Sequence, residues 1–237
     1  MLSLERQNRL RDLYRREHPQ WRPATEVYAA HVRRNVTGGS RLLDLGCGRG
    51  GLVEQLGHPL CLVVGLDPDL RSLQEHRLPL PRIQGLSNAL PFATGSFDLV
   101  FSSWLLEHLQ HPAQDLAEIG RVLRSGGAFV FVTPNQRHPL ALLNRLLGRL
   151  GVMQRWLVRK LYARSGGDTF LTFYRANDRA ALVGLARGAG LRLETLETIA
   201  DPTYLAFTPA FYRAAKWIDA RLGAERQVHL VGLMRKA

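Results

Sequence analysis

A glycine-rich turn is the first group of residues in this sequence whose types and spacing suggest chemistry. Residues 42–51 are Leu-Leu-Asp-Leu-Gly-Cys-Gly-Arg-Gly-Gly. Glycines let the backbone turn sharply and approach a ligand closely, because no Cβ intervenes, and a helix that follows such a turn begins beside the ligand. A turn that only packs a helix onto a strand is the alternative. Gly46, Gly48 and Gly51 also fit the dinucleotide pattern G-x-G-x-x-G, so NAD binding has to be considered.

A carboxylate follows the next apolar run. Asp67 ends the stretch Gly65-Leu66-Asp67-Pro68, about 20 residues after the glycine turn, where doubly wound nucleotide-binding folds place the acid that binds ribose hydroxyls. Two carboxylate oxygens can accept hydrogen bonds from both hydroxyls. Asp67 could instead cap a helix, because Pro68 suits the first helical turn. The glycine turn favours the ribose role.

The elements that must position these residues alternate along the chain. We expect short strands near 41–45, 61–66, 82–84, 98–102 and 127–133, with helices near 50–56, 69–76 and 113–123 between them. Apolar runs such as Cys61-Leu62-Val63-Val64 suit strands that are buried on both faces of a parallel sheet. This alternation predicts a doubly wound α/β fold.

The flanking segments add further elements. Residues 1–36 predict two helices, the first capped by Ser3 and the second beginning near Pro23. The tail predicts a helix at 178–188 capped by Asn177, and then a strand near 191–197, a helix near 208–222 and a strand near 227–235. We expect a single domain over 1–237, with N-terminal helices at 1–36, a cofactor-binding core at 37–135, a basic helical insert or lid at 136–167 and the rest of the sheet at 168–237.

The glycine turn and the segments that follow it resemble class I S-adenosylmethionine-dependent methyltransferases, specifically their small-molecule type 11 subgroup. The turn matches the family motif D/E-x-G-x-G-x-G, and further motifs follow in the family's order and spacing. They are Gly65-Leu66-Asp67-Pro68, Ala89-Leu90-Pro91-Phe92, Ser96-Phe97-Asp98-Leu99-Val100, Leu106-Glu107-His108-Leu109 and Leu123-Arg124-Ser125-Gly126-Gly127. The resemblance implies a Rossmann-like doubly wound seven-stranded sheet, mostly parallel with an antiparallel last strand.

The resemblance also implies a cofactor, S-adenosyl-L-methionine, and the positions that bind it. Asp44 and the backbone of Gly46, Cys47 and Gly48 would hold its methionine part, and Asp67 would hold its ribose. The other implied contacts come from the ends of later strands. They are Leu66 and Pro68 beside the adenine, Leu86 and Ser87 at the adenine edge, and Ser102 and Ser103 after the fourth strand.

Two positions modify this expectation. Leu86 stands where the family usually has an aspartate, so the common hydrogen bond to the adenine amino group is lost, although the Ser87 backbone could still donate to the ring. His108 is the candidate general base, with Glu107 beside it, because a hydroxyl acceptor has to lose a proton and an ordinary histidine pKa of ~6.5 suits that task. A purely structural pairing of Glu107 and His108 is the alternative.

Several acceptors are disfavoured. Adenine-specific DNA methyltransferases carry D/N-P-P-Y/F where this chain has Ser102-Ser103-Trp104-Leu105, and neither Cys47 nor Cys61 stands where a cytosine C5 enzyme needs its nucleophile. No metal site is recognisable. A small-molecule acceptor is therefore expected. The alternatives are an NAD-binding oxidoreductase, which rests on the incidental G-x-G-x-x-G match, and a non-catalytic partner subunit with the same fold.

The segment 138–164 is basic and rich in leucine. Between Gln136 and Gly167 the sequence has seven cations and no acid. At about 100° per residue its cations and leucines fall on opposite sides of a helix. It could be a solvated cap, a lid over an anionic acceptor, or an interfacial helix that contacts an acidic membrane.

Composition sets the remaining limits. The net charge of +12 comes almost entirely from arginine and is weak evidence for an anionic partner, so nucleic acid is not expected. Two cysteines are too few for a disulfide framework, no apolar stretch reaches the ~18–20 residues of a membrane span, and the N-terminus has no signal-peptide pattern. We expect a cytoplasmic protein, with peripheral membrane contact through 138–164 as an option. The oligomeric state is not determined by the sequence.

Overall fold

The structure of the chain is a computed structural model. The structure describes residues 4–55, 62–139, 141–142, 171–205 and 209–237. The chain divides into two compact units, which are described separately. Most of the basic segment 138–164 and the cap at Ser3 lie outside the described residues, so those two expectations, like the expected domain boundaries, stay predictions.

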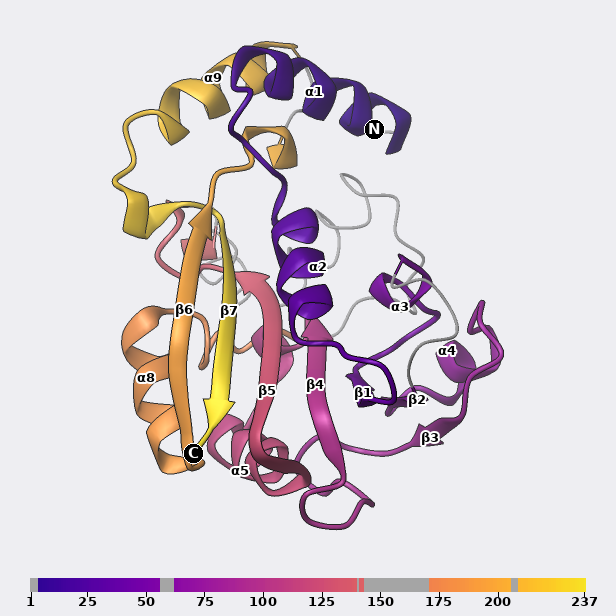
Figure 1. The fold of residues 1–237 in the computed structure, drawn as a ribbon. Coiled ribbons are helices and arrows are strands. Elements are labelled where there is room, and N and C mark those ends of the chain that lie inside the picture. Colours follow the sequence, from indigo (N-terminus) through magenta and orange to yellow (C-terminus); the bar gives the residue numbers. More distant parts are fainter. Residues whose placement is uncertain (1–3, 56–61, 140, 143–170, 206–208) are drawn as a thin grey trace. The chain divides into compact units, whose positions relative to one another are not determined.

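The first unit, here called the sheet unit, comprises Thr25–Thr133, Thr172–Glu197 and Leu230–Ala237. Its centre is a seven-stranded sheet in the order β3-β2-β1-β4-β5-β7-β6. The strands are β1 Arg41–Leu45, β2 Leu62–Asp67, β3 Arg82–Gln84, β4 Phe97–Ser103, β5 Leu123–Pro134, β6 Leu191–Ile199 and β7 His229–Lys236. β1 to β5 pair in parallel, and Figure 1 shows that β7 runs opposite to its neighbours β5 and β6. The predicted doubly wound sheet with an antiparallel last strand is confirmed.

The strands form where continuous apolar runs were found. Leu42 and Leu43 of β1, Leu99 and Val100 of β4, and residues 128–133 of β5 are almost completely buried, as expected for strands covered on both faces. The sheet order reverses beside β1, because β1 pairs with β2 on one side and β4 on the other. Ligands bind at the carboxyl edge of such sheets, at this point of reversal.

Helices of the sheet unit connect the strands. They are α2 Ala24–Arg34, α3 Leu52–Gln55, α4 Leu70–Gln74, the short 3₁₀ helix η1 Leu106–His108, α5 Pro112–Val122 and α8 Arg179–Gly188. α3 begins two residues later than predicted, because Gly50 and Gly51 have positive φ angles of 108° and 156°. α5 and α8 approach closely at Gly120, where a Cβ would lie only 2.3 Å from the carbonyl oxygen of Ala189.

The predicted cap of α8 was wrong by one residue. Asp178 is the N-cap, and its Oδ1 accepts a hydrogen bond from the backbone N–H of Ala181 at 2.8 Å. Asn177, which the sequence offered for that role, is completely buried and donates instead to the hydroxyl of Thr133 at 2.6 Å. The side chain taken for a local cap therefore makes a long-range contact.

The second unit, here called the helical unit, comprises Met1–Ala24, Pro134–Leu171 and Thr198–His229. Its described elements are α1 Leu4–Glu17, the 3₁₀ helices η2 Pro202–Leu205 and η3 Ala224–Arg226, and α9 Pro209–Asp219. Buried polar contacts hold it together. Arg11 reaches Asp201 at 3.4 Å, and Nε2 of His138 lies 3.4 Å from Oδ1 of Asp219.

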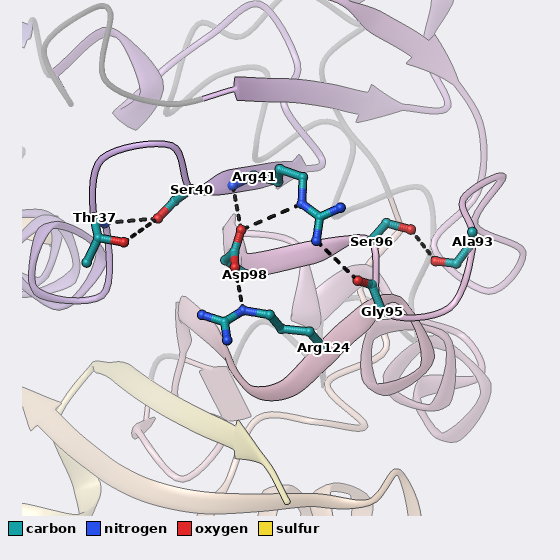
Figure 2. Close-up of polar contacts among 8 residues, drawn as sticks. All are labelled: Thr37, Ser40, Arg41, Ala93, Gly95, Ser96, Asp98 and Arg124. Atoms are coloured by element: carbon teal, nitrogen blue, oxygen red, sulfur yellow. Dashed lines mark hydrogen bonds and ion pairs between the residues drawn. The ribbon is translucent and has the colours of Figure 1, made fainter.

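A polar cluster joins the amino ends of three strands in the sheet unit (Figure 2). Asp98 of β4 accepts a 2.7 Å hydrogen bond from the backbone N–H of Arg41 in β1, and the Arg124 guanidinium of β5 donates to its other oxygen. Because the parallel strands share their direction, this cluster lies at the sheet edge opposite to their carboxyl ends. It holds the strands together and is remote from the candidate site.

Candidate active site

The glycine turn joins β1 to β2 through backbone contacts. The N–H groups of Gly46 and Cys47 both donate to the carbonyl of Leu66, at 2.8 and 3.2 Å. Gly46 has a φ of 75°, and a Cβ there would lie 3.2 Å from a methyl carbon of Leu105. Gly48 also has a positive φ, but a Cβ there would meet nothing within 4 Å. The turn therefore needs glycine at both positions, and open space lies beside the second.

Asp67 connects the same turn to the loop after β2. Its Oδ2 accepts a 2.8 Å hydrogen bond from the N–H of Gly48, and its Oδ1 accepts one of 2.9 Å from the N–H of Asp69. The helix cap suggested as the alternative is wrong, because Asp69, not Asp67, caps α4 and accepts from the N–H of Ser72. The buried Asp67 carboxylate therefore belongs to the loop between the two strand ends, which is the place predicted for a ribose contact.

A second acid lies beside Asp67. Asp44 near the end of β1 is buried, and burial raises the pKa of its carboxyl to about 7, with a further contribution from the charge of Asp67. Two carboxylates at one loop favour a cationic ligand, which would relieve their repulsion. The cofactor implied by the sequence carries a sulfonium and an ammonium group, so these residues fit it.

Tyr28 of α2 is a neighbour that the sequence did not reveal. Its side chain is buried, and its hydroxyl has no hydrogen-bond partner among the described residues. Burial raises the pKa of this phenol, and the charge of Asp44 raises it further, which places Tyr28 within electrostatic reach of the site. A tyrosine inside an amphipathic helix is ordinary core composition, so no sequence signal distinguished it.

Cys47 can be excluded as a nucleophile. The thiol is buried, and burial raises its pKa to about 12, with further contributions from Asp44 and Asp67. A thiolate is the reactive form of cysteine, and this side chain remains a thiol near neutral pH. The side chain packs against β2, where a Cβ on Gly65 would lie 2.8 Å from its sulfur, so the expected cofactor contact would come from the Cys47 backbone.

The residues expected beside adenine lie at or just after the carboxyl ends of β2 and β3. Leu66 is buried, whereas Pro68 is exposed and Leu86 has 57% of its surface exposed. The hydroxyl of Ser87 donates to Oδ1 of Asp115 in α5 at 2.5 Å. The Ser87 side chain is therefore held by α5. This leaves the predicted contact to the adenine ring with the Ser87 backbone, as expected from the sequence.

The carboxyl end of β4 carries the next group. Ser102 is completely buried, and its hydroxyl has no partner within the described part of the chain, whereas Ser103 is half-buried. Trp104 has a left-handed φ of 57°, and its N–H donates to the carbonyl of Val132 in β5 at 2.9 Å. Non-glycine residues with such a φ are uncommon and mark functional loops more often than regular connections.

A buried chain of hydrogen bonds surrounds Glu107. The Thr133 hydroxyl donates to Oε2 of Glu107 at 2.9 Å, and the side-chain amide of Asn177 donates to the Thr133 oxygen. The Glu107 carbonyl also accepts from the N–H groups of Phe173 and Tyr174. Burial raises the pKa of the Glu107 carboxyl to about 7, although the Thr133 hydrogen bond lowers it.

His108 lies beside this carboxylate. Its Nε2 is 4.0 Å from Oε1 of Glu107, and its side chain remains 28% exposed. Glu107 is thus fixed inside the protein, whereas the His108 side chain is partly exposed. The sequence predicted both residues, but it missed Thr133 and Asn177, which fix the carboxylate, because their contact joins segments that lie far apart in the chain.

The structure brings the predicted residues together as two groups. The first group comprises Asp44, the glycine turn and Asp67, at the carboxyl ends of β1 and β2. The second comprises Ser102 and Ser103 at the carboxyl end of β4 and the Glu107–His108 pair just after it. Among the described residues there is no cluster of histidine, cysteine and acid side chains that could hold a metal ion.

Known proteins match the same region. Residues 43–131 match the family described as "Methyltransferase domain". An uncharacterized methyltransferase from Synechocystis is 38% identical over 103 residues, which are 41% of this chain and 48% of that protein. The chain thus spans about half the length of that relative. A ubiquinone biosynthesis O-methyltransferase from Thiobacillus denitrificans is 30% identical over 189 residues, or 75% of this chain and 77% of that protein.

Solved structures share the fold. An S-adenosylmethionine-dependent methyltransferase from Mesorhizobium loti superposes with a TM-score of 0.58 at 21% identity, covering 87% of this chain and 96% of that one. At this identity the likeness concerns the fold, and it extends the match well beyond residues 43–131.

Proposed function

This chain belongs to the class I S-adenosylmethionine-dependent methyltransferases, and we propose that it transfers the methyl group of this cofactor to a small-molecule acceptor. The observation that carries the proposal is the pair of buried carboxylates, Asp44 and Asp67, on either side of a glycine turn that has open space at Gly48. An oxidoreductase that uses NAD would not need the first of these acids.

Different residues of the chain would bind different parts of the cofactor. Asp44 would accept from its ammonium group, the backbone of residues 46–48 would contact its methionine part, and Asp67 would accept from the ribose hydroxyls. Leu66 and Pro68 would flank the adenine, with Leu86 and the Ser87 backbone at its edge. When bound, the cofactor supplies a methyl group that is already activated by the sulfonium charge, so the protein's main task is alignment.

His108 is the proposed general base for an acceptor that has to lose a proton. Its side chain is partly exposed and would accept that proton, and the nearby Glu107 carboxylate would stabilise the imidazolium that forms. The hydrogen bonds from Thr133 and the Phe173 and Tyr174 N–H groups keep Glu107 in place. Because burial raises the pKa of Glu107 to about 7, this assistance should increase as the pH rises through neutrality.

The acceptor that best suits this pair is a hydroxyl group. Oxygen acceptors such as phenols and enols need a base near neutral pH, whereas carboxylates do not. A relative that matches over 189 residues is named a ubiquinone biosynthesis O-methyltransferase, which supports the same choice. The alternative of a partner subunit without activity would leave the Glu107–His108 pair without a task.

The proposal is tested by methyl transfer into an unfractionated pool of acceptors. Purified protein is incubated with methyl-labelled S-adenosylmethionine and a small-molecule extract, and the products are separated and identified by mass. We expect label in one or a few small molecules that gain one methyl group on oxygen, and little label with the His108→Ala variant. Absence of transfer to any fraction, despite cofactor binding, would favour the partner-subunit alternative.

The location of the protein and its contact with a membrane are a separate question from the reaction. No described helix has both the length and the apolar composition that crossing a bilayer requires. A cytoplasmic location, and a contact between the basic segment 138–164 and either an acidic membrane or an anionic acceptor, remain proposals. Replacing the arginines of that segment with glutamine should weaken binding to whichever of these partners it contacts.

A further inference from the structure

Helix α9 of the helical unit has its polar side inside and its apolar side outside. Tyr212 and Asp219 are buried, with 6% and 8% of their surfaces exposed. Phe211, Trp217 and Ile218 are 57%, 58% and 41% exposed. An ordinary surface helix has the opposite arrangement, with its apolar stripe against the core. Three large apolar side chains on one exposed helix indicate a contact surface.

The polar contacts of the inner side fix this orientation. Oδ1 of Asp219 lies 3.4 Å from Nε2 of the buried His138. The Asp219 carbonyl accepts from Nε2 of Gln227 at 3.2 Å, and the Lys216 ammonium donates to Glu17 of α1. Turning the apolar side inward would break these contacts within the helical unit and expose the buried Tyr212. The outward position of Phe211, Trp217 and Ile218 is therefore built into the packing.

The outer side of α9 is also basic. Arg213 is exposed, and the Arg221 guanidinium, just after the helix, lies 3.9 Å from the centre of the Trp217 ring. At about 100° per residue, Phe211, Ala214, Trp217, Ile218 and Arg221 share one face. The only acid of α9, Asp219, is buried. Aromatic side chains combined with cations, without exposed acids, are typical of helices that lie in the surface of an anionic bilayer.

We propose that the outer surface of α9, defined by Phe211, Trp217, Ile218 and Arg221 on one face and by the exposed Arg213 at its margin, is a docking surface for an anionic lipid bilayer. Phe211, Trp217 and Ile218 would enter the boundary between headgroups and acyl chains, and the two arginines would remain at the level of the lipid phosphates. The inference does not depend on methyl transfer, because it uses no residue of the candidate active site.

Charge argues against other occupants. A symmetric contact between two copies places the same patch on both sides, which would bring like charges together. The basic segment 138–164 has the same sign of charge and contains no acid, so it offers no counter-charge to the arginines. An anionic surface satisfies both the arginines and the apolar side chains.

The test is flotation of the full chain with vesicles of phosphatidylglycerol and phosphatidylcholine, compared with vesicles of phosphatidylcholine alone. We expect strong binding to the anionic vesicles, weaker binding at high salt, and little binding to neutral ones. The triple variant Phe211→Ser, Trp217→Ser, Ile218→Ser should lower the partition constant at least about tenfold, since it removes the side chains that enter the bilayer. Arg213→Gln and Arg221→Gln should each lower it about fivefold.

A matched control replaces exposed apolar residues elsewhere. Leu62 and Val183 are 70% and 38% exposed in the sheet unit, so the double variant Leu62→Ser, Val183→Ser should bind anionic vesicles as the parent does. Equal binding by the parent and the α9 triple variant would overturn the proposal. The proposal would also be overturned if the parent formed dimers in sedimentation velocity and did not bind vesicles, while the triple variant was monomeric.

Fluorescence quenching by brominated lipids locates the contact. Trp217→Phe keeps an aromatic side chain at the surface, so it should bind vesicles nearly as well as the parent but lose the share of the quenching that Trp217 contributes. Trp156→Phe measures the share of the basic segment 138–164, which contains the other tryptophan that could reach a membrane. Trp21→Phe is the comparison variant, because the Trp21 indole donates to the Ala200 carbonyl inside the helical unit and should contribute little quenching. Undiminished quenching in Trp217→Phe would contradict the assignment of α9.

Discussion

At the scale of single residues, the most informative feature is a buried carboxyl group whose ionisation lowers the stability of the fold. Asp44 is buried beside Asp67, and burial raises its pKa to about 7. Ionising it near neutral pH is therefore unfavourable in the absence of a cation. A ligand with a positive charge reverses this penalty, which links the electrostatics of the glycine turn to the cofactor that the family uses.

Asp44→Asn should therefore change stability and binding in opposite directions. The folded carboxyl keeps its proton between about pH 4 and pH 7 while the unfolded one loses it, so the parent loses stability as the pH rises through this range. At pH 8 the variant should be more stable to unfolding by about 2–4 kcal/mol, yet bind S-adenosylhomocysteine more weakly. Denaturant unfolding and calorimetry measure the two effects. Unchanged affinity would remove Asp44 from the site.

His108→Ala should lower turnover by about 100-fold or more if the acceptor is a hydroxyl, because the base is lost. S-Adenosylhomocysteine affinity should stay within about threefold, since the proposed role of His108 concerns the acceptor and not the cofactor. Single-turnover rates with labelled cofactor measure the first quantity and calorimetry the second. Turnover close to that of the parent would return His108 to a structural role.

At the scale of elements, the strands bring together residues whose partners lie far apart in the sequence. The strand positions and the glycine turn were predictable, because apolar runs and local spacing determine them. The resemblance to a family added the Glu107–His108 pair and supported Asp67, and their roles stay predictions. Tyr28, Thr133 and Asn177 were not predictable, because their significance comes from contacts that only the fold creates. For the same reason Asn177 was mistaken for the cap of α8, a role that belongs to Asp178.

Thr133→Val tests how β5 contributes to the site. The Thr133 hydroxyl donates to Glu107 and lowers its pKa, so its removal should raise that pKa and move the neutral limb of the pH–rate profile to higher pH. The buried amide of Asn177 would lose its acceptor, at a cost of about 1–3 kcal/mol in unfolding free energy. A destabilised variant with an unmoved pH profile would show that Glu107 takes no part in the reaction.

Asp98→Ala is the matched test at the opposite edge of the sheet. Asp98 accepts from the Arg41 backbone and from Arg124, and these contacts hold the amino ends of β1, β4 and β5 together (Figure 2). Their loss should lower the unfolding free energy by about 1.5–3 kcal/mol. Calorimetry should still give the parent's affinity for S-adenosylhomocysteine. A large fall in affinity would mean that strand alignment, and not the carboxyl-edge residues alone, determines binding.

At the scale of the whole molecule, the chain combines a widespread catalytic fold with an unusual outer surface. The sheet unit carries the cofactor motifs and matches methyltransferases in sequence and fold. The helical unit carries α9, whose apolar and basic outer face suits an anionic bilayer. Together with a net charge of +12, this surface favours encounters with anionic partners and does not determine the reaction.

Calorimetric titration of the purified chain with S-adenosylhomocysteine and, separately, with NAD tests the central claim most directly. The account predicts that S-adenosylhomocysteine binds at one site and NAD does not. It also predicts that Asp67→Ala, if still folded, weakens the binding by about 1.5–3 kcal/mol through loss of charge-assisted hydrogen bonds. Binding of NAD without binding of S-adenosylhomocysteine would contradict the account.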